Sequence, residues 1–172
     1  MKLYNELAEH YFAIESHHRN IIDDVRLVLE TTPAKGQKAL LDVGCGSGEH
    51  LNEFARRGFQ CTGIDTSDTI LSVARRRFPD AGAFVRSNML DIGFIDEFDI
   101  AVSFFGTINY LLEDDEIAQF FQNIHSALKS GGRIFVEIWN SSPVQKIRTK
   151  KLTHISTTVN STAAIERFRG FA

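Results

Sequence analysis

The stretch LLDVGCGSGEH, residues 40–50, most constrains what this chain can fold into. A short apolar run leads directly into Gly44, Gly46 and Gly48, and a segment with helical character follows. Glycines at this spacing allow the backbone to turn sharply and to come close to a ligand. The stretch therefore predicts a buried strand, a ligand-holding turn and a helix, in that order.

The alternation of strand and helix continues along the chain. Apolar runs predict five strands, and amphipathic segments predict helices between them. Such alternation predicts an α/β protein, with a doubly wound, Rossmann-like, mainly parallel sheet covered by helices on both faces. Gly131 and Gly132 are expected to end the last helix. The predicted strands are 39–44, 59–65, 82–88, 98–106 and 133–139, and the predicted helices are 49–58, 67–78 and 113–132.

The chain divides into three predicted parts. Residues 1–36 have helical periodicity and are expected to form an N-terminal lid, with Tyr4 and Tyr11 as candidate lining residues. Residues 37–142 form the α/β domain, and residues 143–172 predict an antiparallel hairpin. A sheet of this type usually continues beyond its fifth strand, so we expect that this chain lacks the last strands rather than that the fold is a compact variant.

Composition excludes several classes of function. The net charge is −3 and the pI is about 6.1, which argues against a nucleic-acid partner, and Arg75, Arg76 and Arg77 are expected to be solvated on a helix. No signal peptide and no apolar run of about 18 residues is visible, so no membrane partner is expected. Cys45 and Cys61 do not have metal-ligand or disulfide spacing. We therefore expect a soluble cytoplasmic protein that has reduced cysteines and holds no metal.

The glycine spacing narrows the choice of ligand. Dinucleotide-binding loops have the pattern G-x-G-x-x-G, which brings a pyrophosphate to the helix N-terminus. Here the sixth position is Glu49, whose carboxylate would repel a diphosphate. The pattern therefore disfavours a nicotinamide cofactor and leaves open a ligand without phosphate.

Polar residues follow the first three predicted strands. Asp42 lies at the end of the first strand, where it can order the turn or attract an ammonium group through water. Asp65 ends the second strand and can accept both hydroxyls of a ribose. After the third strand, Asn88 offers an amide to an adenine edge and Met89 a thioether to its face. Asp42 as a turn cap and Asn88 as a strand-end cap remain open alternatives.

Five segments in this order resemble the class I S-adenosylmethionine-dependent methyltransferases: LDVGCGSGEH, GID, SNMLD, FDIAVSFFGTINYL and LKSGGRIFVEIW. The resemblance covers about residues 38–140. Within that family, VSFFGTINYL and VEIW are similar to the sugar-amine N,N-dimethyltransferases and the glycine/sarcosine methyltransferases. The resemblance implies S-adenosyl-L-methionine as the cofactor and methyl transfer to a small-molecule acceptor, at an amine nitrogen in preference to oxygen.

The resemblance also implies roles for individual residues. The glycines would approach the methionine part of the cofactor, and Asp42 would order their loop. This chain differs from its relatives at Asn88, where they often have Asp. The implied cofactor-binding residues are Asp42, Gly44, Gly46, Gly48, His50, Asp65, Thr66, Asn88, Met89, Ser103 and Phe104. From their places just past the fourth strand and at the end of the fifth, the candidate catalytic residues, which would position the acceptor, are Asn109, Tyr110 and Glu137, with Trp139 and Asn140 as further wall residues.

Two other functions stay open at this point. The short C-terminus is compatible with a cofactor-binding module that lacks a complete acceptor site, and a nucleotide-dependent oxidoreductase is disfavoured by Glu49 but not excluded. The acceptor's identity and the oligomeric state are left open. A homodimer would use the open edge of the C-terminal hairpin.

Overall fold

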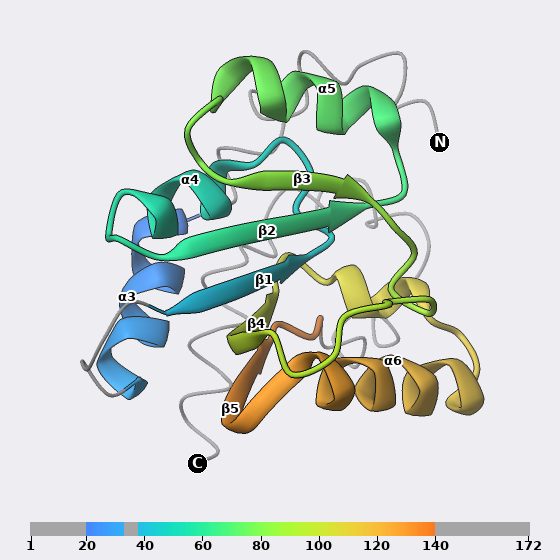
Figure 1. Ribbon diagram of the computed structural model, residues 1–172. Helices are drawn as coiled ribbons and strands as arrows, with labels where there is room; N and C mark the ends of the chain where they lie inside the picture. The colour runs from blue at the N-terminus through green and yellow to red at the C-terminus, as the bar shows by residue number, and fades with distance from the viewer. Residues whose placement is uncertain (1–19, 33–37, 140–172) are drawn as a thin grey trace, which may run out of the picture.

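A computed structural model of the chain describes residues 20–32 and 38–139. A five-stranded sheet lies at its centre, with the strand order β3-β2-β1-β4-β5 and parallel pairing throughout (Figure 1). The predicted α/β, doubly wound parallel sheet is confirmed for this part of the chain. The strands are β1 (Ala39–Val43), β2 (Gln60–Asp65), β3 (Ala83–Arg86), β4 (Phe98–Ser103) and β5 (Leu128–Val136); the helices are α3 (Ile21–Thr31), α4 (Glu49–Ala55), α5 (Asp68–Arg77), the 3₁₀ helix η3 (Thr107–Tyr110) and α6 (Asp114–Ala127).

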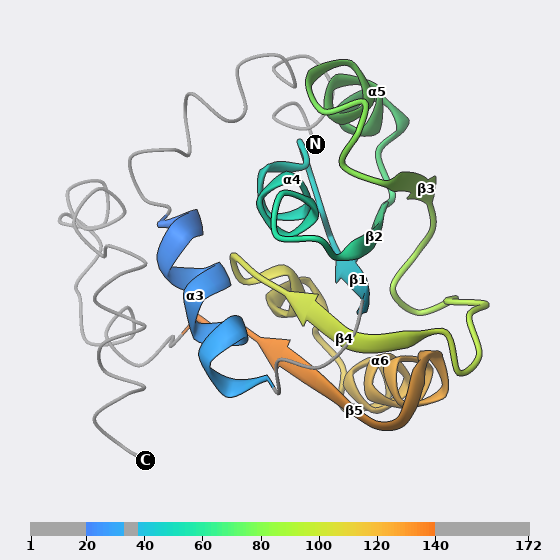
Figure 2. The same ribbon diagram turned by 60° about the vertical axis from the view of Figure 1, so that its left-hand side comes forward.

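Helices cover both faces of the sheet. The helices α3, α4 and α5 pack on one face through residues such as Val28, Phe54 and Leu71. On the other face, α6 contributes Phe120 and Ile124 to a second core cluster. Figure 2 shows this arrangement, with α6 on the face opposite α3, α4 and α5. Neighbouring residues of β1 therefore enter different cores, which explains why that strand is apolar on both faces.

The topology fixes where a ligand can bind. The strand β1 lies between β2 and β4, and the chain leaves it first towards β3 and later towards β5. In an open parallel sheet, the crevice at such a switch point, outside the carboxyl ends of the strands, is the usual ligand site. The glycine turn follows β1 at this place.

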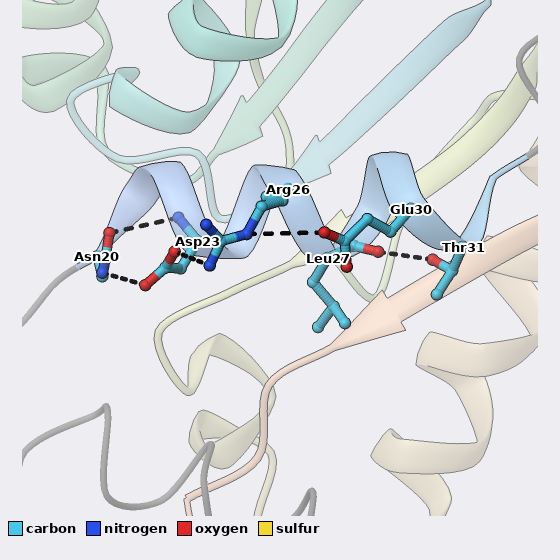
Figure 3. A network of polar contacts seen from close by, with 6 residues as sticks. All are labelled: Asn20, Asp23, Arg26, Leu27, Glu30 and Thr31. Carbon is cyan, nitrogen blue, oxygen red and sulfur yellow. Dashed lines mark hydrogen bonds and ion pairs between the residues drawn. The ribbon is translucent and has the colours of Figure 1, made fainter.

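Helix α3 is stabilised locally at its exposed surface. Asn20 caps the helix, since its Oδ1 accepts from the backbone N–H of Asp23 at 3.3 Å. Arg26 forms an ion pair with Asp23 and lies 3.8 Å from a carboxylate oxygen of Glu30 (Figure 3). These exposed pairs contribute little to stability. The helix is held in place mainly by the buried Val25 and Val28, which pack in the first core cluster.

The predicted boundary between the last helix and the last strand is wrong. The helix predicted over 113–132 ends at Ala127, and β5 begins at Leu128 rather than at residue 133. The reason is sheet pairing: Leu128 pairs with Phe98, and the ladder resumes only at Arg133, opposite Ile100. Residues 129–132 bulge between these two pairs, and Gly131 has a φ of +79° there. The two glycines serve the bulge and not the end of the helix.

Several predictions fall on other parts of the chain. The lid residues Tyr4 and Tyr11, the candidate acceptor residue Asn140 and the hairpin predicted over 143–172 lie outside the described residues. Within the described ranges, the strands pair only in parallel. These predictions therefore stay predictions.

Candidate functional site

The turn after β1 is built for close backbone approach. Gly44, Gly46 and Gly48 have φ values of +80°, +53° and +87°, a region that side chains disfavour. A Cβ on Gly44 would lie 2.5 Å from the side chain of Thr107, and one on Gly48 would lie 2.9 Å from the ring of Phe84. The neighbouring side chains therefore leave no room for a side chain at Gly44 or Gly48. The turn lies at the switch point of the sheet, where the N–H of Gly44 donates to the Ile64 carbonyl oxygen at 2.8 Å and that of Gly48 donates to the Cys45 carbonyl oxygen at 3.0 Å.

Asp65, at the end of β2, holds this turn from the neighbouring strand. Its Oδ2 accepts from the backbone N–H of Gly46 at 3.1 Å, and its Oδ1 accepts from that of Ser67 at 2.9 Å. Burial raises the pKa of this carboxyl, and the backbone hydrogen bonds from Ser67, Gly46 and Thr66 oppose the rise. Because each carboxylate oxygen has more than one acceptor position, Asp65 can also receive ribose hydroxyls.

Glu49 has a role that the sequence did not reveal. Its side chain is only 5% exposed, accepts a hydrogen bond from Ser47 Oγ at 2.6 Å and forms an ion pair with Arg77 of α5. The guanidinium of Arg77 also lies 4.8 Å from the ring centroid of Phe78. The carboxylate expected to repel a diphosphate is therefore compensated, and Arg77 is not the simply solvated residue predicted.

Four predicted cofactor residues lie beneath the turn. Asp42 is 3% exposed at the end of β1, and Ser103 donates to the carbonyl oxygen of Val43 at 3.2 Å. The ring of His50 lies 4.8 Å from that of Phe104, between centroids. Asp42, Ser103 and Phe104 thus lie at the carboxyl ends of β1 and β4, and His50 of α4 contacts Phe104.

His50 has an additional partner that no local pattern suggested. Its Nε2 lies 3.0 Å from Oδ2 of Asp24 on α3, and both side chains are nearly buried. The residue thus connects the helix after the glycine turn to the N-terminal helix. A sequence separation of 26 residues explains why the pair was missed.

The residues after β3 are less enclosed. Oδ1 of Asn88 accepts from the backbone N–H of Leu90 at 3.0 Å, so this side chain caps the strand end, one of the two alternatives above. Met89 is half-buried against the second core cluster, and Thr66 is exposed at the end of β2. The amide NH₂ group of Asn88 remains the group it can present to a ligand.

The predicted acceptor residues meet at the ends of β4 and β5. Asn109 and Trp139 bond reciprocally: Trp139 N donates to Asn109 Oδ1 at 3.1 Å, and Asn109 Nδ2 donates to the Trp139 carbonyl at 3.4 Å. Tyr110 is 52% exposed. Oε2 of Glu137 accepts from the backbone N–H of Phe105 at 2.5 Å. The structure therefore brings Asn109 to Trp139, and the side chains of Asn109 and Glu137 both form hydrogen bonds with the main chain.

The cysteines do not add a reactive group. Both are buried, and desolvation raises the pKa of Cys61 to about 12 and that of Cys45 well above its ordinary value. Across residues 20–32 and 38–139, no three His, Cys, Asp or Glu side chains are arranged to hold a metal ion. Among the helices described, none is both long and apolar enough to cross a membrane.

Comparisons with known proteins agree with this geometry. A family model for a methyltransferase domain matches residues 40–132. The dTDP-3-amino-3,4,6-trideoxy-alpha-D-glucopyranose N,N-dimethyltransferase of Streptomyces venezuelae is 33% identical over 117 residues, which cover 68% of this chain and 48% of that protein. The dTDP-3-amino-3,6-dideoxy-alpha-D-glucopyranose N,N-dimethyltransferase of Streptomyces fradiae is 30% identical over 139 residues, 78% of this chain and 53% of that protein.

A solved structure extends the likeness to three dimensions. The SAM-bound structure of CalS10, an amino pentose methyltransferase from Micromonospora echinaspora, matches with a TM-score of 0.65 and 28% identity. The match covers 74% of this chain and 55% of that one. The chain thus spans about half the length of the curated relatives it matches.

Proposed function

The chain belongs to the methyltransferase domain family, and from that premise we propose that it transfers a methyl group from S-adenosyl-L-methionine to an amine nitrogen of a small-molecule acceptor. The single observation that supports this most is the glycine turn held by Asp65 at the switch point of the sheet. A second supporting observation is the likeness to enzymes whose names specify amino-sugar N,N-dimethylation. The proposed acceptor class is accordingly a nucleotide-linked amino sugar.

The cofactor would lie across the carboxyl ends of β1, β2 and β4. The glycine turn would lie against its methionine part, and Asp65, which accepts from the N–H groups of Gly46 and Ser67, would also accept from its ribose hydroxyls. The Asn88 amide would donate to the adenine, and Met89 would pack against its face. The buried Asp42 lies below the turn, where a carboxylate favours the positively charged amino group of the cofactor.

The bound cofactor supplies an already activated methyl group on a sulfonium. The remaining work of the chain is to orient the acceptor in line and to exclude water, which together lower the barrier by up to about 7–11 kcal/mol. Asn109 and Tyr110 lie beside the end of β4, where an acceptor would approach. A neutral amine needs no proton removed before it attacks, so no catalytic dyad is required.

The first test measures binding of S-adenosylhomocysteine to the 172-residue chain by calorimetry. We expect micromolar 1:1 binding for the wild type. Asp65→Ala removes two charge-assisted acceptors, each worth about 1.5–3 kcal/mol, so we expect affinity to fall at least about 100-fold. Asp80→Ala is the matched control, because Asp80 is an exposed aspartate before β3. Unchanged affinity in Asp65→Ala, with intact circular dichroism, would remove the ribose assignment.

A second measurement separates the three functions. The chain is incubated with S-adenosylmethionine and a nucleotide-linked amino sugar, and S-adenosylhomocysteine is quantified. Turnover supports the proposal. Tight cofactor binding without turnover on any amine favours a cofactor-binding module, and tighter binding of a nicotinamide cofactor than of S-adenosylmethionine would favour an oxidoreductase.

A further inference from the structure

The loop that follows β4 has a backbone conformation that needs external support. Phe105 has a φ of +58°, in the left-handed region that residues with a side chain rarely adopt. The next residue, Gly106, has a φ of +67°. Two successive residues of this kind turn the chain sharply between β4 and η3. A contact from elsewhere must compensate for the strain.

Glu137 supplies that contact from the neighbouring strand. Its own N–H donates to the Ser103 carbonyl at 2.9 Å, so the β4–β5 pairing extends past the end of β5. Its Oε2 accepts from the N–H of Phe105 at 2.5 Å, and the side chain is only partly exposed. This hydrogen bond connects the residue that follows β5 to the residue with the left-handed backbone after β4.

Trp139 holds the same loop from its other side. A Cβ on Gly106 would lie 2.6 Å from the Trp139 ring, so the ring packs directly on the glycine. The Phe105 and Trp139 rings meet edge to face, with centroids 5.4 Å apart. The reciprocal bonds between Asn109 and the Trp139 main chain complete the attachment.

The loop in turn contacts the glycine turn. Thr107, the first residue of η3, lies so close to Gly44 that a Cβ there would be 2.5 Å from its Cγ2. The Thr107 hydroxyl is oriented by donating to the Phe104 carbonyl at 3.0 Å. A shift of the loop would therefore move one wall of the glycine turn.

We propose that Glu137 is a positioning residue: it fixes the loop after β4 through Phe105 and so sets Thr107 against Gly44 in the cofactor site. This inference rests on the proposed function and replaces direct contact with the acceptor as the role of Glu137. The essential property in this role is an oxygen that accepts a hydrogen bond from the Phe105 N–H. The negative charge is not needed for it.

The test uses the 172-residue chain and two readouts. Trp139 is the chain's one tryptophan, so its emission reports the packing of the loop without any ligand. Calorimetry with S-adenosylhomocysteine reports the glycine turn. The variants are Glu137→Ala, which removes the acceptor oxygen, and Glu137→Gln, which retains one. Glu97→Ala is the control, because Glu97 is exposed before β4, at the opposite end of that strand.

We expect Glu137→Ala to shift the tryptophan emission to the red, to increase its quenching by acrylamide and to weaken S-adenosylhomocysteine about tenfold, since about 1.4 kcal/mol corresponds to tenfold. Glu137→Gln should keep the wild-type emission and bind within about twofold of the wild type. Glu97→Ala should match the wild type in both readouts.

Two results would overturn the inference. One is wild-type emission and affinity in Glu137→Ala. The other is weakened binding in Glu137→Gln with unchanged emission, which would mean that the charge acts on the ligand directly. If Glu137→Ala does not fold, Glu137→Gln still decides between these roles. Absence of binding by the wild type would instead contradict the proposed function, so the two failures are distinguishable.

Discussion

Replacing Arg77 with alanine tests whether the buried carboxylate behind the glycine turn needs its ion pair. The Glu49 side chain is 5% exposed and that of Arg77 is 34% exposed, so the carboxylate bears most of the desolvation. Removing one partner of a fully buried pair costs about 3–5 kcal/mol. Partial exposure of Arg77 lets water reach the site and screens the pair, and we therefore expect a loss of about 2–3 kcal/mol in the free energy of unfolding.

The assay is urea unfolding at pH 7, followed by circular dichroism. Arg56→Ala is the matched control, because Arg56 is 73% exposed and lies 3.9 Å from Glu53 in an ordinary surface pair. That variant should lose no more than about 0.5 kcal/mol. Adding Glu49→Gln to Arg77→Ala should recover part of the loss, since a buried amide costs less than a buried carboxylate.

The reasoning is refuted if Arg77→Ala costs no more than Arg56→Ala. It is refuted equally if the double variant with Glu49→Gln is no more stable than Arg77→Ala alone. Either result would mean that the Glu49 carboxylate is well solvated in the absence of Arg77. The ion pair would then be incidental to the glycine turn.

Two further predictions concern the same region. Gly48→Ala should lower the free energy of unfolding by about 2–5 kcal/mol, the sum of a left-handed backbone cost and overlap with the Phe84 ring. Urea unfolding measures this loss, and a loss under about 0.5 kcal/mol would contradict the packing. Because burial raises the pKa of the Cys61 thiol to about 12 and that of Cys45 in the same direction, the unfolded thiols ionise first, and stability should fall as the pH rises above about 8.5 towards 12. Neither thiol should react with a disulfide reagent at pH 8 until the chain unfolds, and fast labelling of the native protein would refute this.

The fold was predictable from the sequence because its signals are local. Strand and helix alternate with short connections, and the helix predicted over 67–78 is present as α5. Ser67 caps it, with its Oγ accepting from Ile70 N at 3.4 Å. The end of α6 was not predictable in the same way. It depends on the pairing of Leu128 with Phe98, a contact 30 residues away along the chain that no helix propensity or glycine signal encodes.

The candidate site shows the same difference between features with local signals and features that depend on distant contacts. The glycine turn and Asp65 follow from spacing, because a turn at a strand end and an acidic residue after the next strand occupy fixed places in this topology. The contacts that hold these residues in place do not follow from sequence spacing. Arg77 reaches Glu49 across 28 residues and Glu137 reaches Phe105 across 32, and both pairs depend on how separate elements pack.

These contacts change how the polar residues at the strand ends should be interpreted. Asp65 and Glu137 were both assigned to ligands, yet each accepts hydrogen bonds from the main chain of a neighbouring loop. At Asp65 both carboxylate oxygens accept, so an asparagine would turn its NH₂ group towards one of two backbone donors and disturb the glycine turn. Loss of ligand binding in such a variant is therefore not proof of ligand contact. A residue of this kind is assigned by the variant that keeps its loop contact and removes only its charge, which is why the choice between direct and indirect action at Glu137 depends on glutamine rather than alanine.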